Sequence, residues 1–240
     1  MQLTPEDRAF LDTYEPSDFP RPSVTVDLVV FTVIDSDLKV LLVQRDQPPF
    51  RTHWALPGGF VQVGDGASQG ESLEQAAERE LVTETGLPQG RSYLEQLYTF
   101  GRPGRDPRMR VITVAYTALV RPDLAPLVAG DDAADARWFS VEHGLPSLAF
   151  DHAEILEKGT ERLRNKLDYS PVGFRLVAET FTIAELRGVH EAVMGGTYDP
   201  GNFRRRFNRM LSDGLIELAE GKRQTSRRPA KVYRFVSELR

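Results

Sequence analysis

The feature that most constrains the fold is a glycine pair followed by a helical run of acidic residues, "GGFVQVGDGASQGESLEQAAERELVTETGL", residues 58–87. From Glu71 the apolar residues recur at steps of three and four, which predicts an amphipathic helix that runs to Glu84. Gly86 follows where such a helix ends, as a helix-capping glycine does. The stretch therefore predicts a helix that packs by one face, next to a loop whose glycines let backbone approach it closely.

Two carboxylates on this predicted helix indicate a metal site. Glu80 and Glu84 are four residues apart, so both lie on one helix face. Neighbouring carboxylates repel each other, and a divalent cation removes that repulsion; oxygen ligands favour Mg²⁺ or Mn²⁺. Taken singly, two such glutamates are more often a solvated face, and a glycine pair is more often a turn. It is the combination with Arg79, two helical turns after Glu71, that favours a site.

This combination resembles the Nudix box, G-x5-E-x7-R-E-U-x-E-E-x-G-U, where U is aliphatic. From Glu71 onward the spacing matches. The resemblance implies an α/β/α sandwich over about residues 20–165 and Mg²⁺-dependent hydrolysis of a nucleoside diphosphate linked to another group. It also implies that Glu71, Arg79, Glu80 and Glu84 are the catalytic residues, with Glu80 and Glu84 as the metal ligands.

The stretch departs from the Nudix box at two places. Thr83 stands at the first of the paired glutamates, and eleven residues rather than five separate Gly59 from Glu71. The missing carboxylate is expected to weaken binding of a second or third metal ion. The six-residue insertion is expected to shift the glycine loop. The pocket therefore has two interpretations, a working hydrolase or an enzyme pocket kept for another purpose.

The surrounding sequence predicts a mixed α/β domain. Residues 24–34 and 38–45 form a predicted hairpin of strands, rich in β-branched residues. Further strands are predicted at 94–101, 111–120 and 136–140, and a helix at 146–167. We expect an N-terminal extension over 1–20, a Nudix domain over 21–167 and a DNA-binding domain over 168–240.

Arginines cluster next to one predicted strand, in "GRPGRDPRMR". Arginine suits pyrophosphate because its donors form paired, charge-assisted bonds, although each arginine alone is more often solvated. "RDPR" before "VITVAYTAL" resembles Nudix proteins that handle ADP-ribose or NAD-related compounds. The candidate ligand-binding residues are Arg45, Gly58, Gly59, Phe100, Arg105 and Arg108, with Phe100 as a base-stacking or core residue. His143 and His152 are assigned no catalytic role.

After "DYSP" the sequence predicts a winged helix-turn-helix. Thr182 and Glu185 form a capping box at the start of one helix, and the glycine pair 195–196 ends it. Asp199 then caps a second helix with Pro200 at its first position, and two short strands joined by a basic loop follow.

Charge supports a nucleic-acid partner for this second unit. The whole chain carries −5, but residues 170–240 hold 13 Lys/Arg against 8 Asp/Glu, a net +5, which leaves −10 for the rest. The predicted DNA contacts are Asn202, Arg204, Arg205, Arg206, Arg209, Lys222, Arg223, Arg227, Arg228 and Lys231. On the second helix Phe203, Phe207, Met210 and Leu211 are expected to be buried. A solvated basic helix or a dimerisation module is the alternative.

A Nudix domain followed by such a module resembles the Nudix-related transcriptional regulators of NAD metabolism. That family implies a homodimer that binds a palindromic DNA operator and is released by ADP-ribose, with a Nudix box that is often degenerate. The alternative function is an active Mg²⁺-dependent ADP-ribose pyrophosphatase with an accessory winged helix. A third interpretation is an RNA-linked hydrolase that holds its substrate with the basic module.

Composition narrows the setting. The chain has no cysteine, which excludes disulfides, cysteine-based zinc sites and thiol catalysis, and favours the cytoplasm. The acidic N-terminus lacks the basic and apolar regions of a signal peptide, and no apolar run is long enough for a membrane span.

Overall fold

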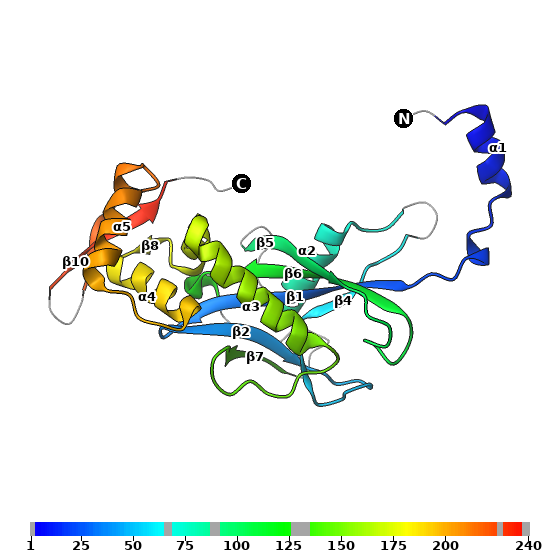
Figure 1. Cartoon of the computed structure of the whole chain (residues 1–240), viewed down its shortest axis with the longest axis horizontal. Helices are drawn as coiled ribbons and strands as arrows, with labels where there is room; N and C mark the ends of the chain where they lie inside the picture. The colour runs from blue at the N-terminus through cyan, green and yellow to red at the C-terminus, as the bar shows by residue number, and fades with distance from the viewer. Residues whose placement is uncertain (1–2, 65–68, 87–91, 126–134, 225–227, 237–240) are drawn as a thin grey trace.

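The structure is a computed structural model of the 240-residue chain, and it describes residues 3–64, 69–86, 92–125, 135–224 and 228–236. An N-terminal arm leads into an α/β/α sandwich, and a winged helix lies at the opposite end of the molecule (Figure 1). The predicted fold class, a Nudix sandwich with a C-terminal winged helix, is confirmed.

A mixed sheet forms the centre of the sandwich, in the strand order β3-β2-β1-β6-β5, with β4 paired to β1 and β7 paired to β2. The strands are β1 (Ser23–Ile34), β2 (Asp37–Gln44), β3 (Trp54–Ala55), β4 (Gly58–Phe60), β5 (Tyr93–Phe100), β6 (Val111–Leu119) and β7 (Asp135–Ser140). β1 and β6 run parallel, and the other pairs are antiparallel. The predicted hairpin of β1 and β2 is confirmed.

Alternation along β1 assigns its side chains to the two faces of the sheet. Val26, Leu28 and Val30 belong to the core under α2 (Leu73–Thr85). Val29 and Phe31 belong to the core under α3 (His152–Tyr169). A helix therefore covers each face, as an α/β/α sandwich requires.

The glutamate helix begins and ends with local capping. Ser72 accepts a hydrogen bond from the backbone of Gln75, whose side chain accepts one from the backbone of Ser72. Gly86 ends α2 in the left-handed conformation at φ 66°, as its position predicted. The prediction of a helix here is confirmed, with its start at Leu73 rather than Glu71.

The second predicted helix of the sandwich starts later than expected. Residues 146–151 are not part of α3, which begins at His152 with Asp151 as its N-cap. Before it, Leu148 forms a bridge with Trp54, and Phe150 adopts φ 55°. Tertiary contacts to β3 thus outweigh helix propensity over these residues.

The C-terminal unit follows the predicted order closely. It contains η3 (Pro171–Leu176), β8 (Thr180–Phe181), α4 (Ile183–Met194), α5 (Pro200–Ser212), β9 (Ile216–Arg223) and β10 (Ala230–Phe235). Thr182 and Glu185 form the predicted capping box, and Asp199 accepts from the backbone of Asn202 at 2.8 Å. β9 and β10 form the wing, with β8 as the third strand.

One continuous core joins the sandwich to the winged helix. Buried side chains of α3, such as Ile155 and Leu163, belong to the same cluster as Leu186 of α4 and Phe207 of α5. The expected domain boundary at 167/168 falls in the last turn of α3. The two units are therefore packed together rather than tethered by a free linker.

The N-terminal arm consists of α1 (Pro5–Thr13) and η1 (Pro16–Asp18), and it extends away from the sandwich (Figure 1). Every described residue of the arm before Ser23 is exposed. A short turn, η2 (Pro122–Leu124), follows β6. Among the described residues, no helix has the length and apolar character needed to cross a membrane.

Candidate functional site

A cavity of about 340 Å³ opens between α2, the end of β2, the loop before β6 and the start of α3. Its volume falls within the range of small-molecule sites. Five of the six predicted ligand residues line it, all except Phe100, and both predicted metal ligands do. These residues are Arg45, Gly58, Gly59, Arg105 and Arg108, together with Glu80 and Glu84.

Arg79 organises the glutamates of α2. Its Nε and one terminal nitrogen donate to the two oxygens of Glu71 at 2.9 and 2.6 Å, and its other terminal nitrogen donates to Glu80 at 2.6 Å. The same side chain also donates to the carbonyl of Phe60 at 3.1 Å. The hydrogen bonds from Arg79 lower the pKa of Glu71. Arg79 thus ties the helix to the glycine loop, and its predicted contact with Glu71 is present.

The glycine loop lies against these carboxylates. A Cβ at residue 59 would come 2.2 Å from an oxygen of Glu80, and one at residue 58 would come 2.3 Å from the carbonyl of Val26. Gly58 is therefore required by its close approach to backbone, whereas a side chain at residue 59 would displace the Glu80 carboxylate.

The six-residue insertion leaves the glycine loop tied to the helix. The backbone nitrogen of Glu71 donates to the carbonyl of Gln62 at 3.1 Å, and the backbone nitrogen of Gln62 donates to the Glu71 carboxylate at 2.8 Å. The extra residues are thus confined between Gln62 and Glu71, and residues 65–68 lie outside the described part of the chain. The expected shift of the glycine loop stays a prediction.

The carboxylates fit a divalent ion only in part. Glu80 and Glu84 line the cavity, whereas Thr83 is exposed and does not. Within the described residues, no group of three or more His, Cys, Asp or Glu side chains is arranged to hold a metal ion. Glu80 and Glu84 are the residues that would hold Mg²⁺, with fewer charges than a complete Nudix box offers.

Two arginines and an aromatic ring form a cationic wall of the cavity. The guanidinium groups of Arg45 and Arg108 lie 4.8 and 5.7 Å from the ring centre of Phe150. Burial and the positive charge of Arg108 lower the pKa of Arg45. Two like charges held this close favour an anion between them, and the ring offers a flat surface beside it. The carboxylate of Asp106 pairs with Arg108 at 2.7 Å and holds it in place.

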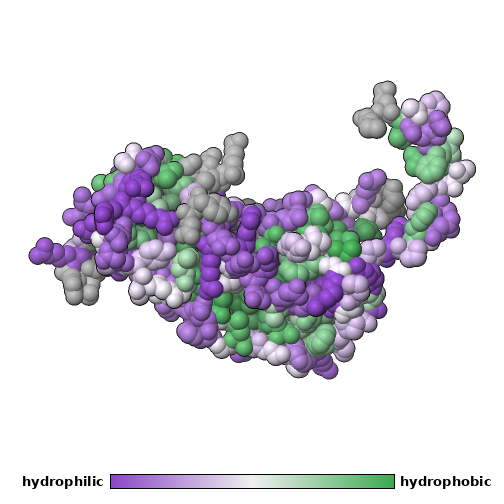
Figure 2. Space-filling view, in the orientation of Figure 1, coloured by the Kyte–Doolittle hydropathy of each residue, from purple (hydrophilic) through white to green (hydrophobic). Residues whose placement is uncertain are grey.

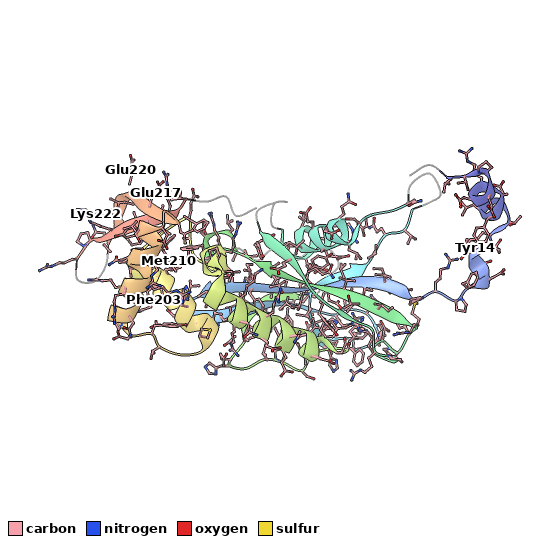
Figure 3. The ribbon with its side chains drawn as sticks, turned by 45° about the horizontal axis from the view of Figure 1, so that its top comes forward. Tyr14, Phe203, Met210, Glu217, Glu220 and Lys222 are labelled. Atoms are coloured by element: carbon pink, nitrogen blue, oxygen red, sulfur yellow. The ribbon has the colours of Figure 1, made fainter. Side chains whose placement is uncertain are left out.

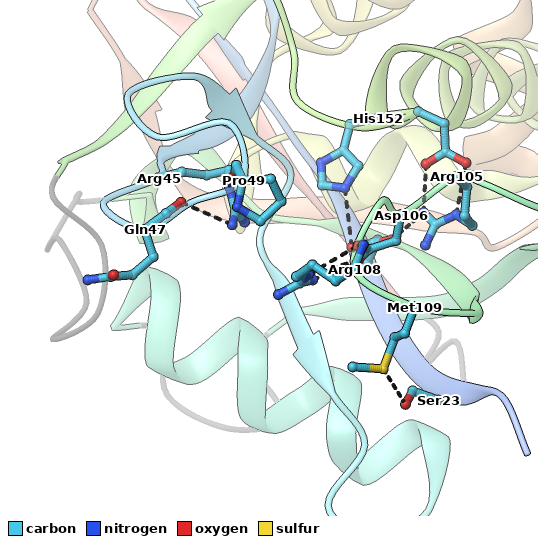
Figure 4. Close-up of polar contacts among 11 residues, drawn as sticks. Ser23, Arg45, Gln47, Pro49, Arg105, Asp106, Arg108, Met109 and His152 are labelled. Atoms are coloured by element: carbon cyan, nitrogen blue, oxygen red, sulfur yellow. Dashed lines mark hydrogen bonds and ion pairs between the residues drawn. The ribbon is translucent and has the colours of Figure 1, made fainter.

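Arg105 belongs to a buried polar cluster rather than to this open wall (Figure 4). It donates to both oxygens of Asp151, at 2.8 and 2.6 Å, and lies 3.3 Å from Asp27. His152 Nε2 lies 3.6 Å from Asp27, and His152 Nδ1 accepts from the backbone of Leu56 at 2.8 Å. Burial lowers the pKa of His152, so the ring is neutral with its proton on Nε2.

Of the two alternatives for Phe100, the core position is confirmed and the ligand-stacking position is wrong. Phe100 is buried in the core under α3 and is absent from the cavity lining. The aromatic ring beside Arg45 and Arg108 is that of Phe150. Sequence reasoning also missed Asp27, although a single acid within the apolar strand "VTVDLVVFTVI" was a visible signal.

The basic face of α5 forms the candidate DNA interface. Asn202, Arg204, Arg205 and Arg209 are exposed, and Arg205 contacts Asn202. Phe203 and Met210 lie on the same helix, at the winged-helix end far from Tyr14 of the arm (Figure 3). Hydrophilic side chains gather over this end in Figure 2.

A groove beside α5 adds one residue that sequence reasoning missed. Arg187 of α4, Arg204 and Lys231 line it together with Phe203 and Tyr233. Cations from α4, α5 and β10 therefore face one channel, an arrangement that suits a phosphate backbone.

The wing presents further cations. Lys222 and Lys231 lie directly opposite each other in the β9–β10 ladder, and both are exposed. Like charges at such positions destabilise a hairpin unless an anion lies nearby. Arg228 is exposed as well, and Arg227 lies outside the described residues.

Two predicted DNA contacts have structural partners, and one predicted core residue is exposed. Arg206 donates to the carbonyl of Leu167 at 3.1 Å, and Arg223 pairs with Glu185 at 3.0 Å. Leu211, expected in the core, is 39% exposed because it lies in the last turn of α5, beyond the packed face.

The fold and the cavity define a Nudix protein that carries a DNA-binding unit. The NUDIX domain model matches residues 24–159, and the NrtR DNA-binding winged helix domain model matches residues 173–235. The chain belongs to the NrtR family of Nudix-related regulators.

Known relatives span nearly the whole chain. It is 36% identical, over 95% of its length and 88% of the relative, to the ADPR responsive transcriptional repressor NtrR of Acinetobacter baylyi. Shewanella oneidensis NrtR in complex with a 27mer DNA is similar at a TM-score of 0.76 and 38% identity, over 89% of this chain and 93% of that one.

Two further similarities cover the Nudix part. The NUDIX domain of the Shewanella protein, complexed with ADP ribose, matches at a TM-score of 0.57 and 39% identity, over 65% of this chain and 98% of that one. An ADP-ribose pyrophosphatase of Methanocaldococcus jannaschii is 41% identical over 57% of this chain and 72% of its own length.

Proposed function

We propose that this protein is a transcriptional repressor that binds operator DNA through α5 and the wing and is released by ADP-ribose bound in the Nudix cavity. The observation that carries the proposal is one continuous core joining an anion-binding cavity to a basic winged helix. The Acinetobacter relative is a repressor that responds to ADP-ribose, and the Shewanella relative has been crystallised with DNA, which supports the same function here. We infer that the regulated genes belong to NAD metabolism.

In the cavity, we propose that Arg45 and Arg108 bind the diphosphate and that Phe150 stacks on a ring of the ligand. The forked donors of a guanidinium suit a diphosphate, and the ring of Phe150 lies 4.8 and 5.7 Å from the guanidiniums of Arg45 and Arg108. Gly58 and Gly59 line the same cavity with their backbone. The related Nudix domain crystallised with ADP ribose supports this ligand class.

For DNA, we propose that α5 enters the major groove and that the wing lies over the phosphates. Asn202, Arg204, Arg205 and Arg209 are the contacts proposed on the helix, and Lys222, Arg227, Arg228 and Lys231 those on the wing. Arg206 is instead proposed to hold α5 against α3, and Arg223 to hold the wing against α4, because both have protein partners. A homodimer would bring two such helices to a palindromic operator, in the cytoplasm.

The test begins with a duplex selected from a random library by the full-length chain. Binding should weaken steeply with salt and should weaken again when ADP-ribose is added. The double variant Arg204→Ala/Arg205→Ala should lose this binding, while Arg137→Ala, on the exposed edge of the sandwich, should not. Tighter binding of single-stranded DNA or of RNA with the same sequence than of the duplex would contradict the proposal.

A second candidate, an ADP-ribose pyrophosphatase, is favoured by Glu80 and Glu84, which both line the cavity. Mg²⁺ held there would stabilise negative charge on the pyrophosphate as water attacks. Arg79 would orient Glu80, and Glu71 would fix Arg79. Release of AMP that is lost in Glu84→Gln would establish this activity, and both functions can hold together. Division into an arm over 1–20, a Nudix domain over 21–167 and a winged helix over 168–240 remains our proposal.

A further inference from the structure

A buried ion pair links the cavity to the start of α3. Asp27, Arg105 and His152 line the cavity, whereas their partner Asp151 does not. Asp151 is the N-cap of α3, and its side chain and that of Arg105 are each only 4% exposed. Burial opposes the charge on Arg105, but the hydrogen bonds and the attraction of Asp151 and Asp27 together outweigh it and raise the pKa of Arg105. Arg105 therefore pairs with the N-cap of α3 and also lines the cavity.

The other end of α3 holds the winged helix. Arg164 donates to the carbonyl of Val193, at the end of α4, at 2.9 Å. Arg206 of α5 donates to the carbonyl of Leu167, at the end of α3, at 3.1 Å. In Figure 1, α3 runs from the sandwich to the flank of α4. One helix thus has its first turn at the cavity and its last turn against both helices of the DNA-binding motif.

The middle of α3 is fixed to the sheet. Gly159 lies so close to β1 that a Cβ there would come 3.1 Å from the side chain of Val29. Helix and sheet interdigitate closely at such a point, and packed interiors transmit displacement rather than absorb it. A shift of the first turn of α3 is therefore expected to move its last turn as well.

We propose that the Arg105–Asp151 ion pair transmits occupancy of the cavity to the winged helix through α3. This inference rests on the proposed function, in which ADP-ribose releases DNA. A diphosphate entering the cavity competes with Asp151 and Asp27 for the guanidinium of Arg105. When the Arg105–Asp151 ion pair weakens, the first turn of α3 is less firmly held. The contacts of Arg164 and Leu167, near the C-terminal end of α3, then carry the change to α4 and α5. Arg105 and Asp151 are thus positioning residues.

The test is a coupling ratio, the dissociation constant for the selected DNA duplex with saturating ADP-ribose divided by that without it. Allosteric ratios of this kind are typically about 5- to 150-fold. In Asp151→Asn we expect the ratio to fall below about twofold, while the affinity for DNA alone stays within about threefold of wild type, equivalent to less than 1 kcal/mol. ADP-ribose alone should bind this variant more tightly, because the diphosphate no longer competes with the Asp151 carboxylate for Arg105.

Glu154→Gln is the matched control. Glu154 lies in the first turn of α3 and pairs with Arg102 of the same loop at 3.6 Å, but both side chains are more than half exposed. This variant should keep the wild-type ratio. A reduced ratio in Glu154→Gln equal to that in Asp151→Asn would overturn the assignment to the buried pair.

A second variant at the far end keeps the proposal testable if Asp151→Asn does not fold. Arg164→Met removes the bond to Val193 and should also lower the coupling ratio. A folded Asp151→Asn with an unchanged ratio overturns the proposal, and so does an unchanged ratio in Arg164→Met when the first variant is unfolded. If wild type itself shows a ratio of one, the proposed function fails, which is distinguishable from failure of this pathway.

Discussion

Gln62 and Gly59 tie the glycine loop to the glutamates of the α2 region. Gln62 exchanges two hydrogen bonds with Glu71, so the insertion begins after the glycine loop is already fixed. Gly59 leaves room for Glu80 against the backbone. Neither contact involves residue 83, where threonine stands in place of a carboxylate.

The missing carboxylate at residue 83 predicts that restoring it will raise hydrolytic activity. Thr83→Glu should raise Mg²⁺-dependent release of AMP from ADP-ribose by about tenfold or more, the scale on which groups around a metal alter activity. The residue is exposed, so the substitution should not disturb packing. Product release is measured beside Thr83→Gln, which adds the same length without charge. Equal rates in the two variants would show that the missing carboxylate is not what limits the site.

A substitution of Arg45 tests most directly whether the cavity wall of Arg45, Arg108 and Phe150 binds the ligand. Arg45→Met should weaken ADP-ribose binding by about 1.5–3 kcal/mol, the usual cost of losing a hydrogen bond to a charged group. DNA affinity without ligand should not change, because Arg45 lies in the cavity and not in the winged helix. Calorimetric titration measures the loss, with the exposed neighbour Arg51→Met as control. The ligand assignment fails if both variants bind alike.

Whether the sequence predicts a residue's contacts depends on whether local spacing or tertiary packing determines its position. The contact of Arg79 with Glu71 follows from helical spacing alone and was expected. Phe150 was not, because its place depends on a loop conformation at φ 55° that no periodicity encodes. Arg206 was assigned to DNA because its charge was visible, whereas its partner, the Leu167 carbonyl, appears only when α3 and α5 pack together.

The helices of the winged helix were predictable because their start and end signals are local in the sequence, as is the spacing of Arg79 and Glu71. Caps at Thr182 and Asp199 and the glycine at residue 195 are local, and the structure contains each of them. The start of α3 was missed because residues 146–151 are held by contacts with β3. The cavity cluster of Asp27, Arg105 and Asp151 joins three distant segments, so sequence spacing does not reveal it.

The positive charges of the wing predict that DNA affinity depends on salt concentration. Lys222 and Lys231 face each other across the hairpin, and DNA phosphates would relieve their repulsion. Lys222→Gln and Lys231→Gln should each reduce the slope of log affinity against log salt by about 0.9, the value for one phosphate contact. Arg234→Gln, at the base of the same hairpin and paired with Glu217 at 2.6 Å, is the control. Slopes that stay at the wild-type value would remove the wing from the interface.

Stability of the winged helix should depend on pH through His190. It is 3% exposed between Tyr198 and Phe203, and burial, followed by the charge of Arg206, lowers its pKa from 6.5 to about 4. Because the folded-state pKa is the lower one, its contribution is complete above pH 6.5. That contribution is lost as pH falls from about 6.5 to 4, by on the order of 3 kcal/mol.

Chemical denaturation at pH 7, 5.5 and 4.5 measures this contribution. His190→Phe keeps a ring between Tyr198 and Phe203 but cannot bind a proton, so its free energy of unfolding should decline less over this range. His143→Phe, at an exposed position, should decline as wild type does. A decline in His190→Phe as steep as in wild type would assign the acid sensitivity to other groups.

Across the whole molecule, one packed core joins the acidic sandwich, the proposed ligand site, to the basic winged helix, the proposed DNA-binding unit. A flexible linker would let each unit bind independently. A shared core makes the binding free energies of the two sites depend on each other. Coupling between the two sites, rather than either binding activity alone, is therefore what a regulator of this kind requires.

The most direct measurement is calorimetric titration of ADP-ribose into the full-length chain, free and saturated with its selected duplex. Linkage requires that DNA weaken ADP-ribose binding by the same factor by which ADP-ribose weakens DNA binding. We predict equal factors, each on the order of tenfold or more within the usual allosteric range. An ADP-ribose affinity that is unchanged by DNA would contradict the account, because the two sites would then be independent.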